Sequence, residues 1–520
     1  MNREQFSKII KFLYVIIWII ILIHLYKGFG NLLHEDLEIW QIMLISFQLT
    51  FEVVVLAQIN LLLLGICIVL VNPLDHSNIK KLTEFPIVDI VIPIRRVDIH
   101  ILEDTLIGFS KQSYPVDKMN IYIADDTPEV DKIKNYQQLA NKYKVNYISK
   151  PENKKYKSGM LNLILPELKS EYIAFFDFDQ IPQTTIIEKF LEILQSRQEI
   201  DFVQAKKVFR NLDNIFKIWS ALLYGLYFEV FERSKQFGEI VLFAGSTACF
   251  RRNSIDDVGG IPEHTFTEDN GLSVNLLMNG SKGYYYDKIG SIGNIPPTFS
   301  LQIAQLWRWS NGASHVLRLN IRKLLTSRKL PLAQRLDIIA TLGISPLVVF
   351  IYIYGLSFIP LLVTGVDSSR LVIFNISSTI LVPLFAAITY TILVGVAIVL
   401  AEDDNVSEFK LSHLPGFLFI ALASNLLVIM SGLTGIFGKF GPNSKYGKWT
   451  RKVRIKSIAV FGIIIGVITE YFAIQWFKEG FASASLLIIL GTTLFPSILL
   501  ILFVPNLLKT EQPFDSTHFN

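Results

Sequence analysis

Residues 171–182 read EYIAFFDFDQIP and contain an apolar run followed by two acidic residues. The run Tyr172–Phe176 is predicted to form a buried strand, and Asp177 and Asp179 follow at its end. Two carboxylates this close raise each other's pKa, and burial raises it further. A surface turn that is acidic by chance is one interpretation. The strongly apolar strand favours another, in which Asp177 and Asp179 hold a divalent cation, Mg²⁺ or Mn²⁺.

Strand and helix patterns alternate around this stretch. They predict an α/β domain with a mainly parallel sheet and helices on both faces. Ligands of such sheets bind beyond the carboxyl ends of the strands, where Asp125 and Asp126 also fall. The predicted strands are 87–94, 120–126, 145–150, 171–179 and 201–208, and the predicted helices between them are 102–112, 132–143 and 184–197.

The composition is that of a membrane protein. The 520-residue chain is 51% hydrophobic with a mean hydropathy of +0.42, which is too apolar for an ordinary soluble protein. The net charge of +4 gives no reason to expect nucleic acid as a partner. Cys67 and Cys249 lack a CxxC context, so the sequence predicts neither a disulfide framework nor a zinc site.

Long apolar runs predict a multi-pass protein of the cell membrane with six crossings. The first run is interpreted as an uncleaved anchor, because no cleavage pattern of a signal peptide follows it. The loop 438–456 has basic residues and no acidic one, so it is predicted to be cytosolic, and the run before it to be interfacial or re-entrant. The runs are 9–26, 47–71, 338–364, 371–400, 415–437, 457–477 and 482–504.

These features predict the domain organisation. A cytosolic domain follows two N-terminal transmembrane helices, and interfacial helices separate it from a C-terminal membrane region. That region would hold about four transmembrane helices, the interfacial or re-entrant helix and the basic loop. A further helix at 214–231 is either interfacial or part of the core. The predicted parts are 1–72, 73–298, 299–330, 331–505 and a cytosolic tail at 506–520.

Two further segments could carry chemistry. In KSGMLN (157–162), Lys157 precedes a predicted helix start and could neutralise a phosphate, or it could be a solvated surface lysine. In HTFTEDNGLS, Thr267 has the position of a helix N-cap, with Glu268 and Asp269 in the first turn. These residues could simply cap a helix. A carboxylate there could also take the proton from an attacking hydroxyl group.

Two last segments complete the set of candidates. VLFAGSTACFRR (241–252) is predicted to be a buried strand that enters a Gly–Ser turn, and its two arginines are interpreted as a strand exit. QIAQLWRWSNGA places Gln305, Arg308 and Trp309 on a helix. The aromatic residues are typical of a membrane-interface belt, but a desolvated guanidinium needs an anion, such as a diphosphate.

Taken together, these segments resemble the processive, membrane-embedded family 2 glycosyltransferases, the superfamily of cellulose, hyaluronan and chitin synthases. In that family an aspartate pair, DxD, TED and QxxRW follow one another. The matching segments here are Asp125–Asp126, Asp177/Asp179, Thr267–Asp269 and Gln305–Trp309. TED together with FAGSTACFRR is most similar to cellulose synthases. The match covers about residues 85–315.

The resemblance implies roles for individual residues. Asp269 would be the general base, with Thr267 and Glu268 beside it in the catalytic segment. Asp177 and Asp179 would hold the metal. The residues implied to bind the donor are Asp125, Asp126, Lys157, Asp177 and Arg308, and those implied to bind the acceptor are Gly245, Ser246, Gln305 and Trp309.

The resemblance also implies a fold and an activity. The cytosolic domain would be of GT-A type. It would transfer sugar from a nucleotide sugar, expected to be a UDP-sugar, with inversion to a growing β-linked polysaccharide, and export the chain through a membrane channel. Membrane lipids would surround the enzyme, and an export subunit or a homo-oligomer is compatible with this interpretation. The alternatives are a nonprocessive lipid glycosyltransferase similar to ceramide glucosyltransferase, and a transporter or scaffold. Few charges within the apolar runs disfavour an ion-coupled transporter.

The sequence departs from the cellulose synthase pattern at three places. Thr127 follows the aspartate pair where glycine is common. KWTRK (448–452) only partly matches the gating loop, and the tail 505–520 is expected to hold no cyclic di-GMP-binding PilZ domain. The resemblance therefore does not define cellulose as the product.

Overall fold

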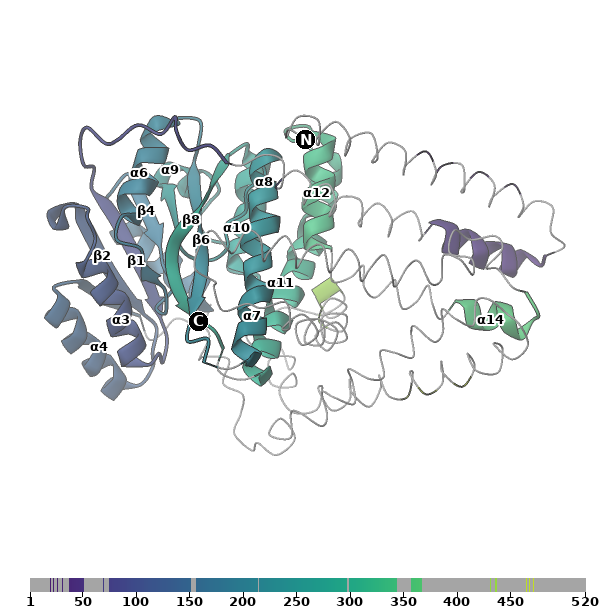
Figure 1. Cartoon of the computed structure of the whole chain (residues 1–520), viewed down its shortest axis with the longest axis horizontal. Helices are drawn as coiled ribbons and strands as arrows, with labels where there is room; N and C mark the ends of the chain where they lie inside the picture. The colour runs from purple at the N-terminus through teal and green to yellow at the C-terminus, as the bar shows by residue number, and fades with distance from the viewer. Residues whose placement is uncertain are drawn as a thin grey trace.

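The computed structural model (Figure 1) describes most of the residues between 74 and 343. The described ranges are 37–50, 74–150, 156–213, 215–296, 299–343 and 357–366, together with isolated positions elsewhere. Residues 39–50 are helical, and a short helix α14 covers Phe358–Val363. No helix in these ranges is long and apolar enough to cross a membrane. Most of the apolar runs that predict membrane crossings lie outside the described residues.

An eight-stranded sheet is the centre of the described domain, in the order β3-β2-β1-β4-β7-β6-β8-β5. Strands β1 to β4 are parallel, but β7 runs antiparallel to both neighbours and β5 antiparallel to β8. Six of the eight strands, β1 to β4, β6 and β8, run in the same direction, so the sheet is mainly parallel, as predicted, with two antiparallel strands. The strands are β1 Val88–Ile94, β2 Met119–Asp125, β3 Asn146–Ser149, β4 Tyr172–Phe175, β5 Ile181–Pro182, β6 Phe202–Arg210, β7 Ala248–Arg251 and β8 Gly283–Asn294.

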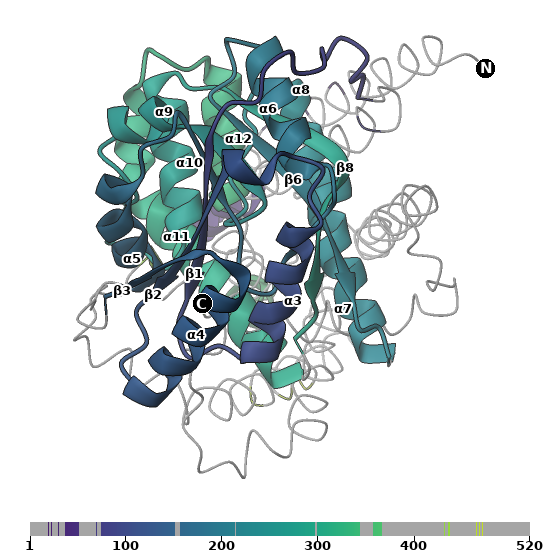
Figure 2. The same cartoon turned by 90° about the vertical axis from the view of Figure 1, so that its left-hand side faces the viewer.

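Helices cover both faces of the sheet, as predicted (Figure 2), and each face has its own apolar core. Ile90 and Ile92 of β1 point to one face and Val91 to the other, so every residue of this strand is buried. Each such side chain contributes about 1.5–3 kcal/mol. The first face is covered by α3 Ile99–Ser110, α4 Val130–Tyr143 and α6 Ile186–Ser196, and the second by α5 Tyr156–Ile164, α9 Arg252–Asp257 and α10 Glu268–Asn279.

A second group of helices packs beside the sheet (Figure 1). Helix α7 (Ile215–Leu226) continues through a π-helical turn, η3 (Tyr227–Glu232), into α8 (Arg233–Phe237). Helix α11 (Phe299–Thr326) packs against α10 and α12 (Leu332–Leu342). These helices bring segments far apart in the sequence to the same side of the sheet.

Candidate active site

The first group of site residues lies at the end of β2. The Asp125 carboxylate accepts hydrogen bonds from the Thr127 amide (2.8 Å) and the Tyr147 hydroxyl. Burial raises its pKa, and these hydrogen bonds partly offset the effect. The neighbouring Asp126 forms an ion pair with Arg95 at 2.8 Å. Asp125 and Asp126 are therefore held in fixed orientations next to the end of β1.

Thr127, which stands where glycine is common in the family that the sequence resembles, has a structural role. Its hydroxyl accepts the Arg96 amide hydrogen bond at 2.9 Å. Arg96 has a φ of 54°, a left-handed conformation that non-glycine residues rarely adopt. Thr127 thus stabilises the loop that follows β1.

The second group forms around Lys157 near the start of α5. The Lys157 ammonium donates to the Asp177 carboxylate (2.6 Å) and the Gly245 carbonyl (2.9 Å), and it lies 3.5 Å from Glu268. Burial opposes its charged form, but the Asp177 and Glu268 carboxylates outweigh burial and raise its pKa. Lys157 is therefore a partly buried cation with carboxylates on two sides, not a solvated surface lysine.

The two aspartates of the DxD segment have opposite pKa shifts. Burial opposes ionisation of Asp177, but Lys157 and Lys207 lower its pKa below the usual value. Burial, followed by the charge of Asp177, raises the pKa of Asp179 to about 7. The strand ends at Phe175, two residues earlier than Asp177, so both carboxylates lie on the loop beyond β4.

This loop fits a divalent cation, although the described residues contain no group of three or more metal-ligating side chains. Two half-buried carboxylates are hard oxygen ligands of the kind that Mg²⁺ and Mn²⁺ accept. Burial, and then repulsion from Asp177, raises the pKa of Asp179, and a nearby cation would favour its ionised form. Asp177 and Asp179 would supply two ligands, and a bound diphosphate could supply others.

Asp269 lies in the first turn of α10, beside the turn that contains Gly245. Burial, and then the charge of Glu268, raise the pKa of Asp269 to about 6. A Cβ atom on Gly245 would lie 2.9 Å from the Asp269 Oδ2 atom, and Gly245 has a φ of 82°. Arg308 of α11 is close enough to act electrostatically on Asp269. Glycine at 245 thus lets the backbone approach the Asp269 carboxylate.

Two of the residues predicted to bind an acceptor, Gln305 and Trp309, come from α11 and meet α7. The Tyr224 hydroxyl donates to the Gln305 side chain at 2.6 Å. The Trp309 ring meets the Tyr224 ring edge to face, with 5.4 Å between their centroids. Trp309 remains 37% exposed. The two helices thus present an aromatic wall with one accessible indole ring.

Thr267 occupies the N-cap position of α10 as predicted, but its side chain makes no capping hydrogen bond. Its buried hydroxyl has no partner among the described residues. A Cβ atom on Gly312 of α11 would come within 2.4 Å of the Thr267 side chain. Thr267 therefore holds the N-cap position without a capping hydrogen bond, and its side chain packs between α10 and α11.

Gly312→Ala is expected to destabilise the protein by about 1–3 kcal/mol, because the new methyl group overlaps the Thr267 side chain. The matched control is Gly225→Ala in α7, where an added Cβ atom meets nothing within 4 Å. That change is expected to be neutral or to stabilise by up to about 1 kcal/mol. Thermal unfolding of both variants in detergent measures the difference, and equal unfolding temperatures would contradict this packing role.

Two residues of β6 that the sequence did not indicate also belong to the site. The Lys207 ammonium donates to the Ala244 carbonyl (2.9 Å) and the Ser246 hydroxyl (3.0 Å), and it acts electrostatically on Asp177. Gln204 bonds to the same turn. A signal was present in the sequence, since Lys206 and Lys207 stand together in a strand with few other charges.

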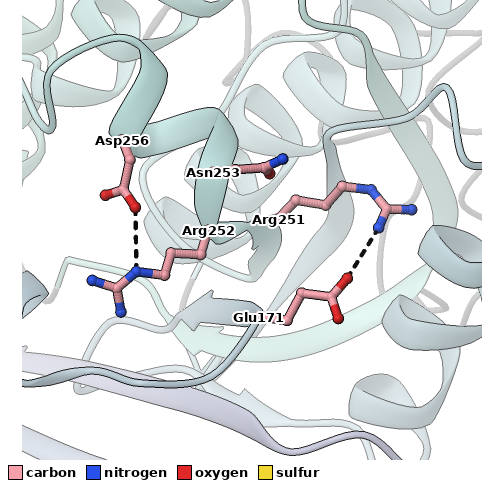
Figure 3. Close-up of a pocket in the computed structure, with 5 residues that line it drawn as sticks. All are labelled: Glu171, Arg251, Arg252, Asn253 and Asp256. Carbon is pink, nitrogen blue, oxygen red and sulfur yellow. Dashed lines mark hydrogen bonds and ion pairs between the residues drawn. The ribbon is translucent and has the colours of Figure 1, made fainter.

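A pocket at the opposite end of β4 is structural (Figure 3). It has a volume of about 410 Å³ and is lined partly by Arg251 and Arg252. Arg251 donates to the carbonyls of Ile200 and Leu194, and Arg252 to those of Leu165 and Leu168. Arg251 also contacts Glu171 (3.5 Å) and the Tyr172 hydroxyl (3.4 Å), and Arg252 pairs with Asp256 (3.2 Å). These bonds agree with the interpretation of the two arginines as a strand exit.

Comparisons with known proteins agree with the geometry. A family model described as Glycosyl transferase family group 2 matches residues 172–398. The cellulose synthase catalytic subunit (UDP-forming) of Xanthomonas axonopodis pv. citri (strain 306) is 26% identical over 261 residues, which cover 48% of this chain and 34% of that protein. Cellulose synthase 2 of Novacetimonas hansenii is 25% identical over 260 residues, 48% of this chain and 16% of that protein. The chain thus matches about a third or less of these relatives' own lengths.

Solved structures are more distantly similar. The mannosyltransferase PcManGT from Pyrobaculum calidifontis, in complex with GDP-Man and Mn²⁺, is 16% identical, with a TM-score of 0.49. The match covers 70% of this chain and 100% of that one. The family match and the cellulose synthase relatives define the class, which is glycosyltransferase. Within that class the matched part of the chain is similar to family 2 glycosyltransferases and, among the relatives, to cellulose synthases.

Proposed function

We propose that this chain transfers a sugar from a nucleotide-sugar donor, a UDP-sugar, to a growing β-linked polysaccharide, with inversion at the anomeric carbon. One observation supports this most strongly. Lys157, Asp177 and Asp269, from α5, the loop after β4 and α10, converge on the turn that contains Gly245. Lys157, a cation that could bind a diphosphate, and Asp269, a carboxylate that could take a hydroxyl proton, therefore both lie next to Gly245.

The donor would occupy the edge of the sheet at the ends of β2 and β4. Asp125 or Asp126 would accept hydrogen bonds from the nucleoside, because both are already fixed in orientation by their neighbours. Lys157 would exchange its contact with Asp177 for the diphosphate oxygens. A divalent cation held by Asp177 and Asp179 would supply positive charge to the leaving diphosphate. This arrangement is the reason for proposing a GT-A-type donor site.

The acceptor would approach along the aromatic wall of α7 and α11, with its terminal sugar against Trp309. Its hydroxyl oxygen attacks the anomeric carbon and forms the new glycosidic bond. The bond from that carbon to the diphosphate oxygen breaks, and its electron pair leaves with the nucleoside diphosphate. The hydroxyl proton passes to Asp269, and Arg308 balances the charge that develops. One base suffices, because the diphosphate leaves without a proton.

We also propose that the catalytic domain lies on the cytosolic side of the cell membrane and that the product is exported through the membrane region. The apolar runs outside the described residues and the basic loop 438–456 support this arrangement. The amphipathic helices α11 and α12 support it as well, because large apolar side chains such as Leu325 and Leu332 are exposed there.

The test is a donor screen on membranes that contain the full chain. Labelled UDP- and GDP-sugars are supplied with Mg²⁺ or Mn²⁺, and the products are separated by size and by solubility. Label in a high-mass polymer is the expected result, and linkage analysis then identifies the product. Label only in an organic-extractable lipid would favour the lipid glycosyltransferase. Failure of every donor to react would overturn the proposal.

The pH dependence of transfer provides a separate prediction. Asp269 must be ionised to act as a base, and its pKa is raised to about 6. At saturating donor and metal, kcat is therefore expected to rise with pH through about 6 and to level off above it. Saturation keeps ionisation of Asp179 from dominating the profile. A kcat that stays constant between about pH 5 and 8 would contradict the role of Asp269.

A further inference from the structure

The turn Ala244–Thr247 has an unusual backbone that surrounding side chains hold in place. Gly245 has a φ of 82° and Thr247 a φ of 57°, so two of its residues are left-handed. A non-glycine residue in this conformation is strained and persists only when the surroundings hold it. The position of this turn therefore depends on its contacts.

Most of those contacts come from β6. The Gln204 side-chain oxygen accepts the Ala244 amide hydrogen bond at 2.8 Å, and its nitrogen donates to the Ser246 carbonyl at 3.0 Å. The Lys207 ammonium donates to the Ala244 carbonyl and the Ser246 hydroxyl. Lys207 also lies over the Phe228 ring, 5.4 Å from its centroid. Charge-assisted hydrogen bonds are the stronger ones, so Lys207 is the dominant anchor on this side.

Lys157 holds the turn from the other side, through the Gly245 carbonyl at 2.9 Å. Two lysines from different elements, α5 and β6, therefore fix three consecutive residues. Only Lys157 forms an ion pair with Asp177 among the described residues. The two lysines thus differ in role, because Lys157 links the turn to the donor carboxylates and Lys207 links it to the sheet.

The Ala244–Thr247 turn limits the space in front of the Asp269 carboxylate. A Cβ atom on Gly245 would lie 2.9 Å from the Asp269 Oδ2 atom, so this oxygen lies against the turn. A shift of the turn by about 1 Å would change access to this oxygen, and misplacements of this size can cost about 10²-fold in rate.

We infer that Lys207 is a positioning residue that fixes the Ala244–Ser246 turn for the acceptor hydroxyl. The inference rests on the proposed function and deepens it. The hydrogen bonds of Lys207 go to the turn and not to the donor carboxylates or the reacting atoms, although its charge also lowers the pKa of Asp177. The donor side and the acceptor side of the site are therefore anchored by different lysines.

The test compares Lys207→Met, which keeps the aliphatic stem, with Lys207→Arg, which keeps the charge and the donors. Transfer is expected to fall by about tenfold or more in Lys207→Met and to recover largely in Lys207→Arg. The Kd of the nucleoside diphosphate is expected to stay within about twofold of wild type, and donor hydrolysis without acceptor is expected to persist. Lys282→Met is the control, because Lys282 pairs with Glu239 at the surface.

Two results would overturn the inference. A Kd for nucleoside diphosphate that weakens in step with transfer would make Lys207 a donor-binding cation. Unchanged sugar transfer by Lys207→Met would show that Lys207 has no role in transfer. If Lys207→Met fails to fold, Ser246→Ala removes only the hydroxyl that Lys207 contacts, and a smaller loss of transfer with the same nucleotide Kd is expected. A wild-type protein without transfer activity would refute the proposed function. An active wild type with the same transfer rate as Lys207→Met would refute only this inference.

Discussion

Asp269→Asn is expected to reduce kcat for sugar transfer by about 10²–10⁴-fold, the usual contribution of a general base. Asparagine has the same shape as aspartate, but it cannot take the proton of the acceptor hydroxyl. Binding of the nucleoside diphosphate is expected to change little, because Lys157 and Asp177 remain in place. Initial rates with saturating donor, together with nucleotide titration, measure the two quantities separately.

The matched control for this variant is Asp256→Asn. Asp256 lies on α9 and pairs with Arg252 beside the structural pocket, at the other end of β4. Its loss is expected to leave kcat unchanged. Transfer by Asp269→Asn at the wild-type rate would exclude Asp269 as the base, whereas no transfer by the wild type would favour the transporter or scaffold interpretation.

Asp179→Ala is expected to abolish metal-dependent donor binding, with a Kd for the nucleoside diphosphate that rises by about tenfold or more and no longer responds to Mg²⁺ or Mn²⁺. The protein is expected to fold. The pKa of Asp179 is raised to about 7 in the folded chain, so above that pH its ionised form is less favourable folded than unfolded. Removing it therefore removes an electrostatic cost at neutral or alkaline pH.

Calorimetric titration of nucleoside diphosphate, with and without EDTA, measures this effect. The control is Asp201→Ala, since Asp201 lies at the start of β6 and bonds to the Lys282 amide, away from the site. Nucleotide binding that survives both the Asp179→Ala change and EDTA would contradict the role of the DxD segment as a metal site.

Much of the sheet could be predicted from local pattern. The segments that become β1, β2, β4 and β6 are rich in β-branched and aromatic residues, and their positions agree with prediction to within a few residues. The order and direction of the strands could not be predicted this way. Strand β7 follows a left-handed turn at Thr247 and pairs antiparallel with β4, and nothing in its four residues ACFR encodes that direction.

For the site as well, some residues could be predicted from the sequence and others could not. Acidic residues at strand ends and at a helix start are visible in sequence, because their chemistry is unusual in those places. Lys157, Asp177, Glu268 and Asp269 do meet, as their predicted roles require. Lys207 was missed because a lysine inside a strand is usually on a solvated face. Its actual partners belong to a turn some forty residues away, which only the tertiary fold brings near.

Because of the π-helical turn η3, the geometry of this site depends on the number of residues between Tyr224 and Glu232. A π-helical turn holds one more residue than the equivalent α-helical one, so it rotates everything before it relative to everything after it. Tyr224, before the turn, faces Gln305, while Glu232, at its end, accepts the Leu242 amide hydrogen bond near the sheet. Deleting a single residue here would rotate Tyr224 by about 100° around the helix axis, away from α11. The aromatic wall therefore depends on the number of residues in this helix as well as on its side chains.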